Sequence, residues 1–385
     1  MEIVLEAREQ ALVQRAADFA REQVAPHAAA WEAQRRMPLE TFRAAATAGL
    51  GGLLVPTALG GQGLSYTATA RVVEELSAAC MAFAFSLVVH NNLADNIARN
   101  GTPAQREAHL PPMIRGERVG AFCLTEPGAG SDAAAVRTSA RRDGERWILD
   151  GRKAWVTNAS VANLFSVYAQ TDPALGWKGI ACILAEDTAP GLVREAPYVL
   201  IGGHALGTGE IALQRCAVPA GNLLISPGDA FKAAMRGIGV ARANVGAMCC
   251  GMLRASLEQA LAHAARRQVF GRPVASYQGM QWQLAEVETN LLAARLLTYR
   301  ALAALDRGED GTLHAAHAKK FATRAALSGI AECMQAMGAA GLRDEHSLGR
   351  HLAGAKIAQY LDGATEIQNV VIARALFRAR GVETA

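Results

Sequence analysis

The sequence lacks the marks of a membrane or exported protein. No run among its 385 residues reaches the ~18 uninterrupted apolar residues that a transmembrane helix needs. The first residues, from Met1 to Glu6, are acidic and soon amphipathic, without the basic segment and apolar stretch of a signal peptide. We therefore expect a soluble, cytoplasmic protein with no membrane partner.

Metal-binding, disulfide and nucleic-acid patterns are missing as well. The seven cysteines are scattered and form no CxxC pair, so we interpret them as buried thiols. His314 and His317 share a helical spacing but have no third ligand nearby, so no metal is expected. A net charge of +4 without a block of Lys and Arg gives no footprint for nucleic acid. The expected partners are small molecules.

The common nucleotide fingerprints are also absent. No GxxxxGK(S/T) occurs, which disfavours a P-loop and ATP. The run from Gly60 to Gly63 lacks the preceding strand and the spacing of a dinucleotide fingerprint, which disfavours NAD. This run and Pro56 before it predict a loop.

What the sequence does contain is three regions of different pattern. A chain of this length exceeds what one hydrophobic core usually organises. Residues 1–118 are helical, residues 119–228 are β, and residues 229–385 are helical again with a break at residues 308–311. This order predicts an α+β protein of three domains. The helical stripes are Leu12, Ala16 and Phe19 in the first region and Leu284, Val287, Leu291 and Ala294 in the last.

Short apolar runs carry the β prediction for the middle region. Residues 147–149 are one such run, and Asp150 with Gly151 after it predicts a hairpin turn. Residues 164–168 and 180–184 are two more runs, separated by a loop. Together they predict a small sheet domain.

The strongest chemical motif lies in this region, where residues 122–132 read FCLTEPGAGSD. Its glycines allow backbone amides to approach a ligand, and Thr125 and Ser131 supply hydroxyls. An isolated motif of this kind is more often an ordinary Gly-rich turn. Residues 153–158, KAWVTN, follow and add an aromatic face at Trp155 beside a hydroxyl at Thr157. The pair indicates a nucleotide cofactor.

These stretches resemble the flavin-binding signature of the acyl-CoA dehydrogenase family, here of the short-chain or branched-chain type. Later segments match in order: RQVFG at 267–271, Tyr277 with Gln278, QAMGAAG at 335–341, and AKIAQYLDGATE at 355–366. The resemblance therefore covers nearly the whole chain, and we expected the 267–278 segments to lie in helices.

The resemblance implies a helical N-terminal domain, a middle β domain and a C-terminal four-helix bundle. It also implies FAD as cofactor, an acyl-CoA substrate, a homotetramer and an electron-transfer flavoprotein as acceptor. Contacts to FAD within one subunit are implied for Phe122, Leu124, Thr125, Gly130, Ser131, Trp155 and Thr157. Contacts to the FAD of the adjacent subunit are implied for Arg267, Phe270, Gln278, Gln335 and Gly338. Ala364 and Glu366 are further expected cofactor contacts.

The chemistry requires a carboxylate beside the α carbon of a thioester. The family often uses the Glu of its EGT motif, and the matching residue here is Asp362. Some branches place the base just before the helix arginine, which is Arg242 here, but that position is Ala241. We expect Asp362 to be the base, although Asp before Gly is also common in turns and helix caps. The expected substrate contacts are Ser131, Arg242, Gly363 and Asp95.

Several departures from the family pattern bear on cofactor and substrate. Ala339 stands for the second glycine of a GG pair, and Ala364 stands for a threonine near the flavin. Residues 353–354 read Ala-Gly where many members have Arg-Asp. Gly239 stands for an aspartate that often bonds the pantetheine arm of CoA, which leaves an atypical carrier open.

Residues 90–96 read HNNLADN and are mostly polar. They fall on a helix that the family uses for its acyl pocket. Such residues are mostly exposed, which favours a helix end facing solvent. If some face inward, a short, branched or alicyclic acyl group is favoured over a long straight chain. The expected function is α,β-dehydrogenation of an acyl-CoA, with Asp362 as base and flavin N5 as hydride acceptor. The alternatives are an oxidase, a desulfinase or a dehydrogenase of acyl-carrier-protein thioesters.

Overall fold

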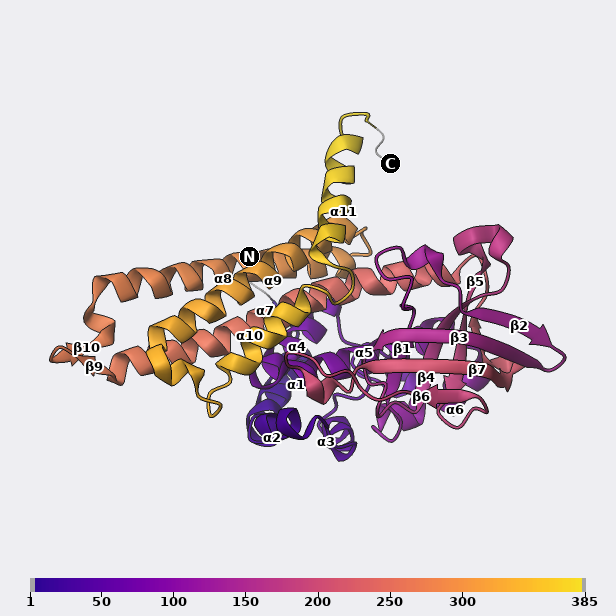
Figure 1. The fold of residues 1–385 in the computed structure, drawn as a ribbon, viewed down its shortest axis with the longest axis horizontal. Helices are drawn as coiled ribbons and strands as arrows, with labels where there is room; N and C mark the ends of the chain where they lie inside the picture. Colours follow the sequence, from indigo (N-terminus) through magenta and orange to yellow (C-terminus); the bar gives the residue numbers. More distant parts are fainter. Residues whose placement is uncertain (1–3, 383–385) are drawn as a thin grey trace.

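The computed structural model describes residues 4–382 and has the expected order of a helical, a β and a second helical region (Figure 1). The β region lies at one end of an elongated molecule, and the long C-terminal helices extend to the other. Within residues 4–382 no helix is long and apolar enough to cross a membrane.

The first region is a cluster of helices around α4 and α5. The predicted stripe of Leu12, Ala16 and Phe19 is buried on α1, as expected. Ser65 caps the start of α4, and the carboxylate of Asp306 accepts two further backbone N–H groups there, from Tyr66 and Thr67. The helices are α1 (Ala7–Phe19), α2 (Ala28–Gln34), α3 (Glu40–Thr47), α4 (Tyr66–Ala79), α5 (Met81–Asn100) and α6 (Pro103–Ile114).

The middle region is one mixed sheet in the order β6-β7-β3-β2-β4-β5-β8, with β1 parallel to β4. The two predicted runs at 164–168 and 180–184 fall in β4 and β5, which pair along their whole length. The strands are β1 (Gly120–Cys123), β2 (Ser139–Asp143), β3 (Arg146–Val156), β4 (Leu164–Gln170), β5 (Ile180–Glu186), β6 (Leu192–Arg194), β7 (Gly209–Pro219) and β8 (Leu223–Ile225).

The predicted hairpin turn at Asp150 and Gly151 is wrong. Both residues lie inside β3, at a register shift in its pairing with β7. Gly151 has φ of 149°, and a Cβ there would lie 2.6 Å from Thr138 Oγ1, so glycine serves a close approach and a bulge. The β2–β3 turn is instead at Gly144, whose φ is 55°.

The last region is built on three long helices. The predicted stripe of Leu284, Val287, Leu291 and Ala294 is buried on α8, and the predicted break falls between α8 and α9. Helix α10 packs on α7 and α9 as the fourth helix, and α11 projects from the body (Figure 1). The elements are α7 (Ala230–Arg266), β9 (Gln268–Val269), β10 (Arg272–Pro273), α8 (Gln278–Asp306), α9 (Thr312–Met337), α10 (Leu348–Ala358) and α11 (Thr365–Arg378).

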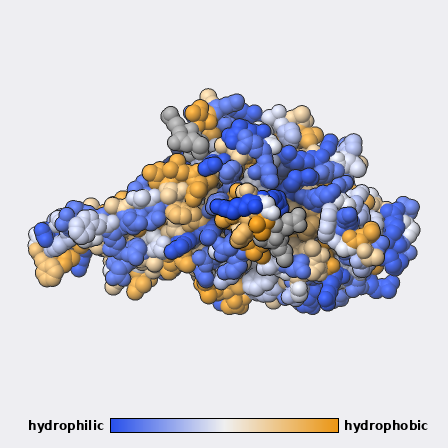
Figure 2. Space-filling view, turned by 90° about the horizontal axis from the view of Figure 1, so that it is seen from above, coloured by the Kyte–Doolittle hydropathy of each residue, from blue (hydrophilic) through white to orange (hydrophobic). Residues whose placement is uncertain are grey.

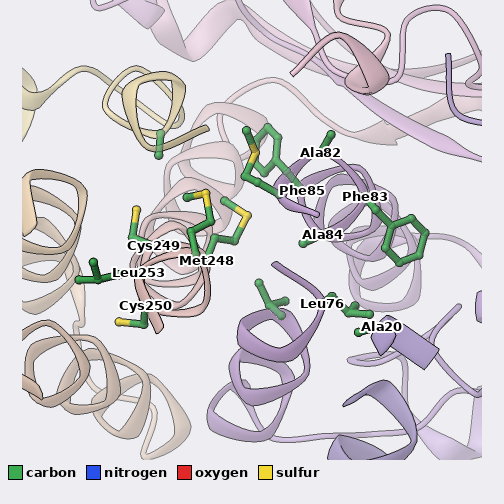
Figure 3. Packing of buried hydrophobic residues seen from close by; sticks show 14 of the residues in the cluster. Ala20, Leu76, Ala82, Phe83, Ala84, Phe85, Met248, Cys249, Cys250 and Leu253 are labelled. Carbon is green, nitrogen blue, oxygen red and sulfur yellow. The ribbon is translucent and has the colours of Figure 1, made fainter. Parts of the chain in front are cut away.

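A shared core joins the two helical regions. Figure 3 shows Leu76 of α4 and Phe83 of α5 on one side and Met248 and Cys249 of α7 on the other. Glu74 is fully buried beside this core and accepts hydrogen bonds from Arg295 and Tyr299. A buried carboxylate is tolerated only with such partners. The contact fixes α4 against α8, and so fixes the first region against the last.

Candidate active site

Asp362 lies in the short connection between α10 and α11. Its φ is 51° and that of Gly363 is 96°, so two consecutive residues have left-handed backbone. This conformation is unfavourable for a residue other than glycine, and such strain persists where the surroundings enforce it. The N-cap of α11 is Ala364, and the Asp362 carboxylate makes no capping hydrogen bond there. Asp362 is therefore not a helix cap, but it does lie in a turn, as the alternative interpretation expected.

Two cations surround this connection. Arg242 of α7 donates from Nε to the backbone oxygen of Asp362 at 2.9 Å. Lys319 of α9 donates from Nζ to the backbone oxygens of Gly363 at 2.7 Å and Gln359 at 3.1 Å. The carboxylate oxygen Oδ2 of Asp362 is buried and has no hydrogen-bond partner within residues 4–382.

Burial raises the pKa of the Asp362 carboxyl to about 6, and the charges of Lys319 and Arg242 oppose that rise. Burial lowers the pKa of the Lys319 ammonium to about 8, against the opposing charge of Asp362. Between these two values Asp362 is anionic and Lys319 is cationic. A carboxylate whose pKa lies close to the working pH suits a general base.

A cavity of about 370 Å³ begins at Asp362 and runs between α5 and α7. The two helices run in opposite directions, because Phe85 of α5 shares a core cluster with Met248, while Leu93 shares one with Ala234. Ala241 of α7 also lines the cavity. The apolar part of the wall includes Leu54, Phe85, Val89, Leu93, Phe122 and Val240.

The polar run on α5 does not form a solvent-facing helix end, which corrects the favoured sequence interpretation. His90 and Asn91 are buried and hold the loop before α4: His90 Nε2 lies 3.1 Å from Gly51 O, and Asn91 bonds Leu50 O and Leu53 N. On a different face of the same helix, three other members of the run line the cavity. These are Asn92, Asp95 and Asn96.

Asp95 is thus placed in the wall of the same cavity as Asp362. Both of its carboxylate oxygens accept from Arg99 Nε, at 2.8 and 2.7 Å, and Arg99 also donates to the hydroxyl of Tyr66 at 3.2 Å. Burial raises the pKa of Asp95, which the contact with Arg99 opposes. Arg236 of α7 lines the cavity too. The wall therefore has an apolar part and a charged, hydrogen-bonding part.

A buried ion pair supports the loop that follows β1. Lys153 is fully buried on β3 and donates to Glu126 Oε1 at 2.8 Å and to Leu124 O at 3.0 Å. Glu126 also accepts from the backbone N–H groups of Arg137 and Thr138. Although burial acts to raise it, Lys153 keeps the pKa of Glu126 below its usual value. Every partner is satisfied, as a buried pair requires.

The same contact joins the two sequence motifs that predicted a cofactor. Ala154 N donates to Thr125 O at 2.9 Å, so the KAWVTN strand lies directly against the FCLTEPGAGSD loop. On the open side, a Cβ added at Gly128 or Gly130 would meet nothing within 4 Å. Trp155, with φ of 56°, presents a ring that is 60% exposed and packs at 4.7 Å from Tyr198.

This surface has the composition that a flavin nucleotide requires. It offers an exposed aromatic face at Trp155, hydroxyls at Thr125 and Ser131, and glycines that leave backbone amides accessible, whereas Thr157 is buried. Phe122 and Leu124 place the start of the loop beside the cavity and the sheet core. The residues present therefore fit an FAD molecule lying over this loop.

The second group of expected FAD contacts lies elsewhere. Arg267 follows α7, and Phe270 forms the β9–β10 turn with a side chain that is 93% exposed, so this segment is a hairpin and not a helix as expected. Figure 1 places β9 and β10 at the end of the molecule opposite the β region. The members of this group are exposed: Arg267, Phe270, Gln278, Gln335 and Gly338. Glu366 is also exposed, on α11 near Asp362.

No cluster of three metal-binding side chains occurs within residues 4–382, and this includes the surroundings of His314 and His317.

Comparison with known families gives three matches along the chain. The N-terminal, middle and C-terminal domains of acyl-CoA dehydrogenase match residues 6–117, 121–216 and 228–377. This chain belongs to the acyl-CoA dehydrogenase family.

Individual relatives are similar over almost their whole length. The bovine mitochondrial short-chain specific acyl-CoA dehydrogenase is 35% identical over 96% of this chain and 90% of its own. Butyryl-CoA dehydrogenase of Megasphaera elsdenii has the same fold with a TM-score of 0.94, 32% identity, and coverage of 98% and 100%. The prolyl acyl carrier protein oxidase AnaB matches with a TM-score of 0.91, 26% identity, and coverage of 97% and 100%.

Membership of the acyl-CoA dehydrogenase family confirms the expected fold, an oxidoreductase activity and FAD as cofactor. Three residues of the site were missed as contributors: Lys153, Glu126 and Lys319. Lys153 begins the KAWVTN motif and Glu126 is inside FCLTEPGAGSD, so charge complementarity between the two motifs was the available signal. For Lys319 the sequence contained no such signal, because the adjacent residue is also a lysine, Lys320, and that one is exposed.

Replacing Lys153 with methionine should weaken FAD binding. The change leaves the Glu126 carboxylate buried without its cation, and breaking such a pair typically costs about 3–5 kcal/mol. Part of that loss should appear as a loosened FCLTEPGAGSD loop and at least ~10-fold weaker FAD binding. Titration of the stripped protein with FAD, followed by flavin fluorescence, measures it. Lys178→Met, at an exposed site of the same region, should bind FAD like the parent.

Proposed function

We propose that this member of the acyl-CoA dehydrogenase family oxidises an acyl thioester between its α and β carbons, with Asp362 as the base. The observation that supports this best is the Asp362 carboxylate, whose Oδ2 is buried without a partner at the wall of the cavity. An unsatisfied buried acceptor is costly, and such groups are kept where chemistry uses them.

Asp362 would take a proton from the α carbon of the bound acyl group. The carboxylate form is required, and a pKa of about 6 leaves it deprotonated at neutral pH. The lost α proton leaves negative charge on the thioester oxygen, which the backbone N–H of Asp362 can stabilise. That N–H makes no hydrogen bond to another backbone group within residues 4–382.

FAD would lie over the FCLTEPGAGSD loop and Trp155, and its N5 would accept the hydride that leaves the β carbon. Arg242 would hold the loop of Asp362 through the backbone oxygen at 2.9 Å, so the base and the acyl group meet in a fixed geometry. Gly363 and Ser131 are proposed as further substrate contacts, the first next to the base and the second on the exposed loop.

A short, branched or alicyclic acyl group is the proposed substrate. Asp95 and Arg99 form an ion pair in the cavity wall, and Asn92 and Asn96 add amides there. A long hydrocarbon chain lying along this wall would remove water from these groups without replacing its hydrogen bonds. A short or compact acyl group would stay beside Phe85 and Val89 and avoid that penalty.

A thioester of an acyl carrier protein is a second candidate substrate. Gly239 leaves the surface of α7 open beside Arg242, where a Cβ would meet nothing within 4 Å, and no carboxylate occupies that position. The similarity to a prolyl acyl carrier protein oxidase points the same way. Oxidase or desulfinase chemistry on the same scaffold is distinguished by whether thioesters reduce the flavin without oxygen.

We also propose that FAD is bound between subunits of a homotetramer, with an electron-transfer flavoprotein as electron acceptor. Arg267 and Phe270 flank β9, at the end of the molecule away from the β region, so we propose that they contact the FAD of an adjacent subunit (Figure 1). In Figure 2 the narrow end, where Figure 1 places β9 and β10, is mostly hydrophilic with a small hydrophobic spot at its tip. Phe270 in this hairpin is 93% exposed, and a contact with an adjacent subunit would cover it.

The direct test is an anaerobic screen of acyl thioesters. Short, branched and alicyclic acyl-CoAs, and the same acyl groups on an acyl carrier protein, should bleach the flavin, while long straight-chain acyl-CoAs should be slower. Absorbance in a stopped-flow instrument gives the rate for each. If no thioester reduces the flavin, the proposed dehydrogenation is wrong.

Asp362→Asn should retain FAD and thioester binding but lose flavin reduction by several orders of magnitude, because the amide cannot accept the α proton. In the parent, the rate should fall as the pH decreases through about 6, where Asp362 becomes protonated. An Asn variant that reduces its flavin at the parental rate would exclude Asp362 as the base. Asp344→Asn, at an exposed site, is the matched control.

Arg267→Ala should weaken FAD binding although Arg267 is remote from the loop that binds FAD in its own chain. A guanidinium pairs phosphate oxygens with two hydrogen bonds, each charge-assisted contact being worth about 1.5–3 kcal/mol. We therefore expect ~10-fold or greater weakening. Sedimentation with flavin absorbance should place FAD only in the oligomer, and an FAD-saturated monomer would contradict the shared site.

A further inference from the structure

Two lysines are fully buried within residues 4–382, Lys153 and Lys319, and they have different hydrogen-bond partners. Lys153 pairs directly with a carboxylate, Glu126. Lys319 instead donates to two backbone oxygens, Gln359 O and Gly363 O, which lie on either side of Asp362. Burying an ammonium group is costly unless its charge and its hydrogens are both compensated.

The compensation comes from the loop that carries the base. Gly363 O accepts from Lys319 at 2.7 Å and from Gln368 Nε2 at 3.0 Å, so two side chains hold one carbonyl. The charge of Lys319 is offset by Asp362, which is half-buried and whose buried Oδ2 lacks a partner. The loop is thereby fastened to α9 through Lys319 on both sides of Asp362, and to α7 through Arg242 at the backbone oxygen of Asp362 itself.

The charged groups that act on Asp362 are Arg242 of α7 and Lys319 of α9. Lys319 in turn interacts with Cys249 of α7 and Glu366 of α11. Burial raises the pKa of the Cys249 thiol to about 12, so it stays neutral. Glu366 is exposed to solvent. Lys319 and Arg242 are therefore the cations that keep the Asp362 carboxylate ionised.

We propose that Lys319 is a positioning residue for the reaction: it holds the Asp362–Gly363 turn by its hydrogen bonds and keeps the base ionised by its charge. This inference rests on the proposed role of Asp362. It assigns the residue two separable effects, because Gln368 shares the first of them and carries no charge. Lys319 would act through the loop and would not touch the substrate.

The test compares four variants of the full-length, FAD-loaded protein. Lys319→Met removes the charge and the donors, while Lys319→Gln removes the charge and keeps a donor. Gln368→Met removes the other donor to Gly363 O and leaves the charge. Lys320→Met makes the same chemical change one residue along α9 at an exposed site, and serves as the matched control.

The primary measurement is infrared difference titration of the Asp362 carboxyl band without substrate, identified by its loss in Asp362→Asn. In the parent the band should titrate near pH 6. In both Lys319 variants its midpoint should move up by about one pH unit, since an adjacent opposite charge lowers an acid's pKa by ~1–3. In Gln368→Met and Lys320→Met it should stay in place.

The second measurement is the pH dependence of flavin reduction by the best thioester. In the Lys319 variants the acid-side fall in rate should shift to higher pH together with the infrared midpoint. Gln368→Met should slow the reaction at every pH without shifting the pH at which the rate falls. A merely structural lysine would lower the rate or the FAD content and leave that pH unchanged. Lys320→Met should match the parent in both measurements.

Two results would overturn the inference. One is an unmoved Asp362 band in either Lys319 variant that still binds FAD. The other, which needs no variant, is a parental band that titrates above about pH 8, where Lys319 itself loses its proton. If no thioester reduces the parental flavin, the proposed function fails while the infrared titration still decides the role of Lys319.

Discussion

A carboxylate remains charged inside a protein only where cations or donors offset its lost water, and this constraint acts on Asp362. Its Oδ2 has no donor, so the offset has to come from the charges of Lys319 and Arg242. These residues come from α9 and α7, two long helices of the C-terminal bundle that pack on each other. The packing of that bundle therefore places the two cations that lower the pKa of a carboxyl group on a loop.

In the β region a buried lysine also compensates a carboxylate, but there the two groups are in direct contact. Lys153 and Glu126 form a direct pair that makes further hydrogen bonds to backbone groups, which gives a rigid support to the loop that we propose binds FAD. Around Asp362 the lysine is directed to main-chain oxygens and the carboxylate is left without a partner at Oδ2. A satisfied pair stabilises structure, while an unsatisfied acceptor is available to a substrate.

Sequence reasoning succeeded where the information is local. The periodic stripes and the cofactor motifs were readable because each lies within one element or one loop. It failed at Gly151, because the register shift depends on pairing with β7 some sixty residues later. It failed again at His90 and Asn91, whose partners are backbone groups of a loop about forty residues earlier. Lys319 was unreadable for the same reason, since its partners are main-chain oxygens of another segment.

The shorter side chain at position 362 has a consequence for the acyl group. Aspartate places its carboxylate about 1.5 Å closer to its own backbone than glutamate would. The backbone cannot easily advance to compensate, because Arg242 and Lys319 hold the oxygens of Asp362 and Gly363. With Asp362 as the proposed base, the acyl group would have to approach the loop, where the small side chain of Ala241 lines the cavity. A compact acyl group that is broad near its α carbon meets this requirement better than a thin straight chain.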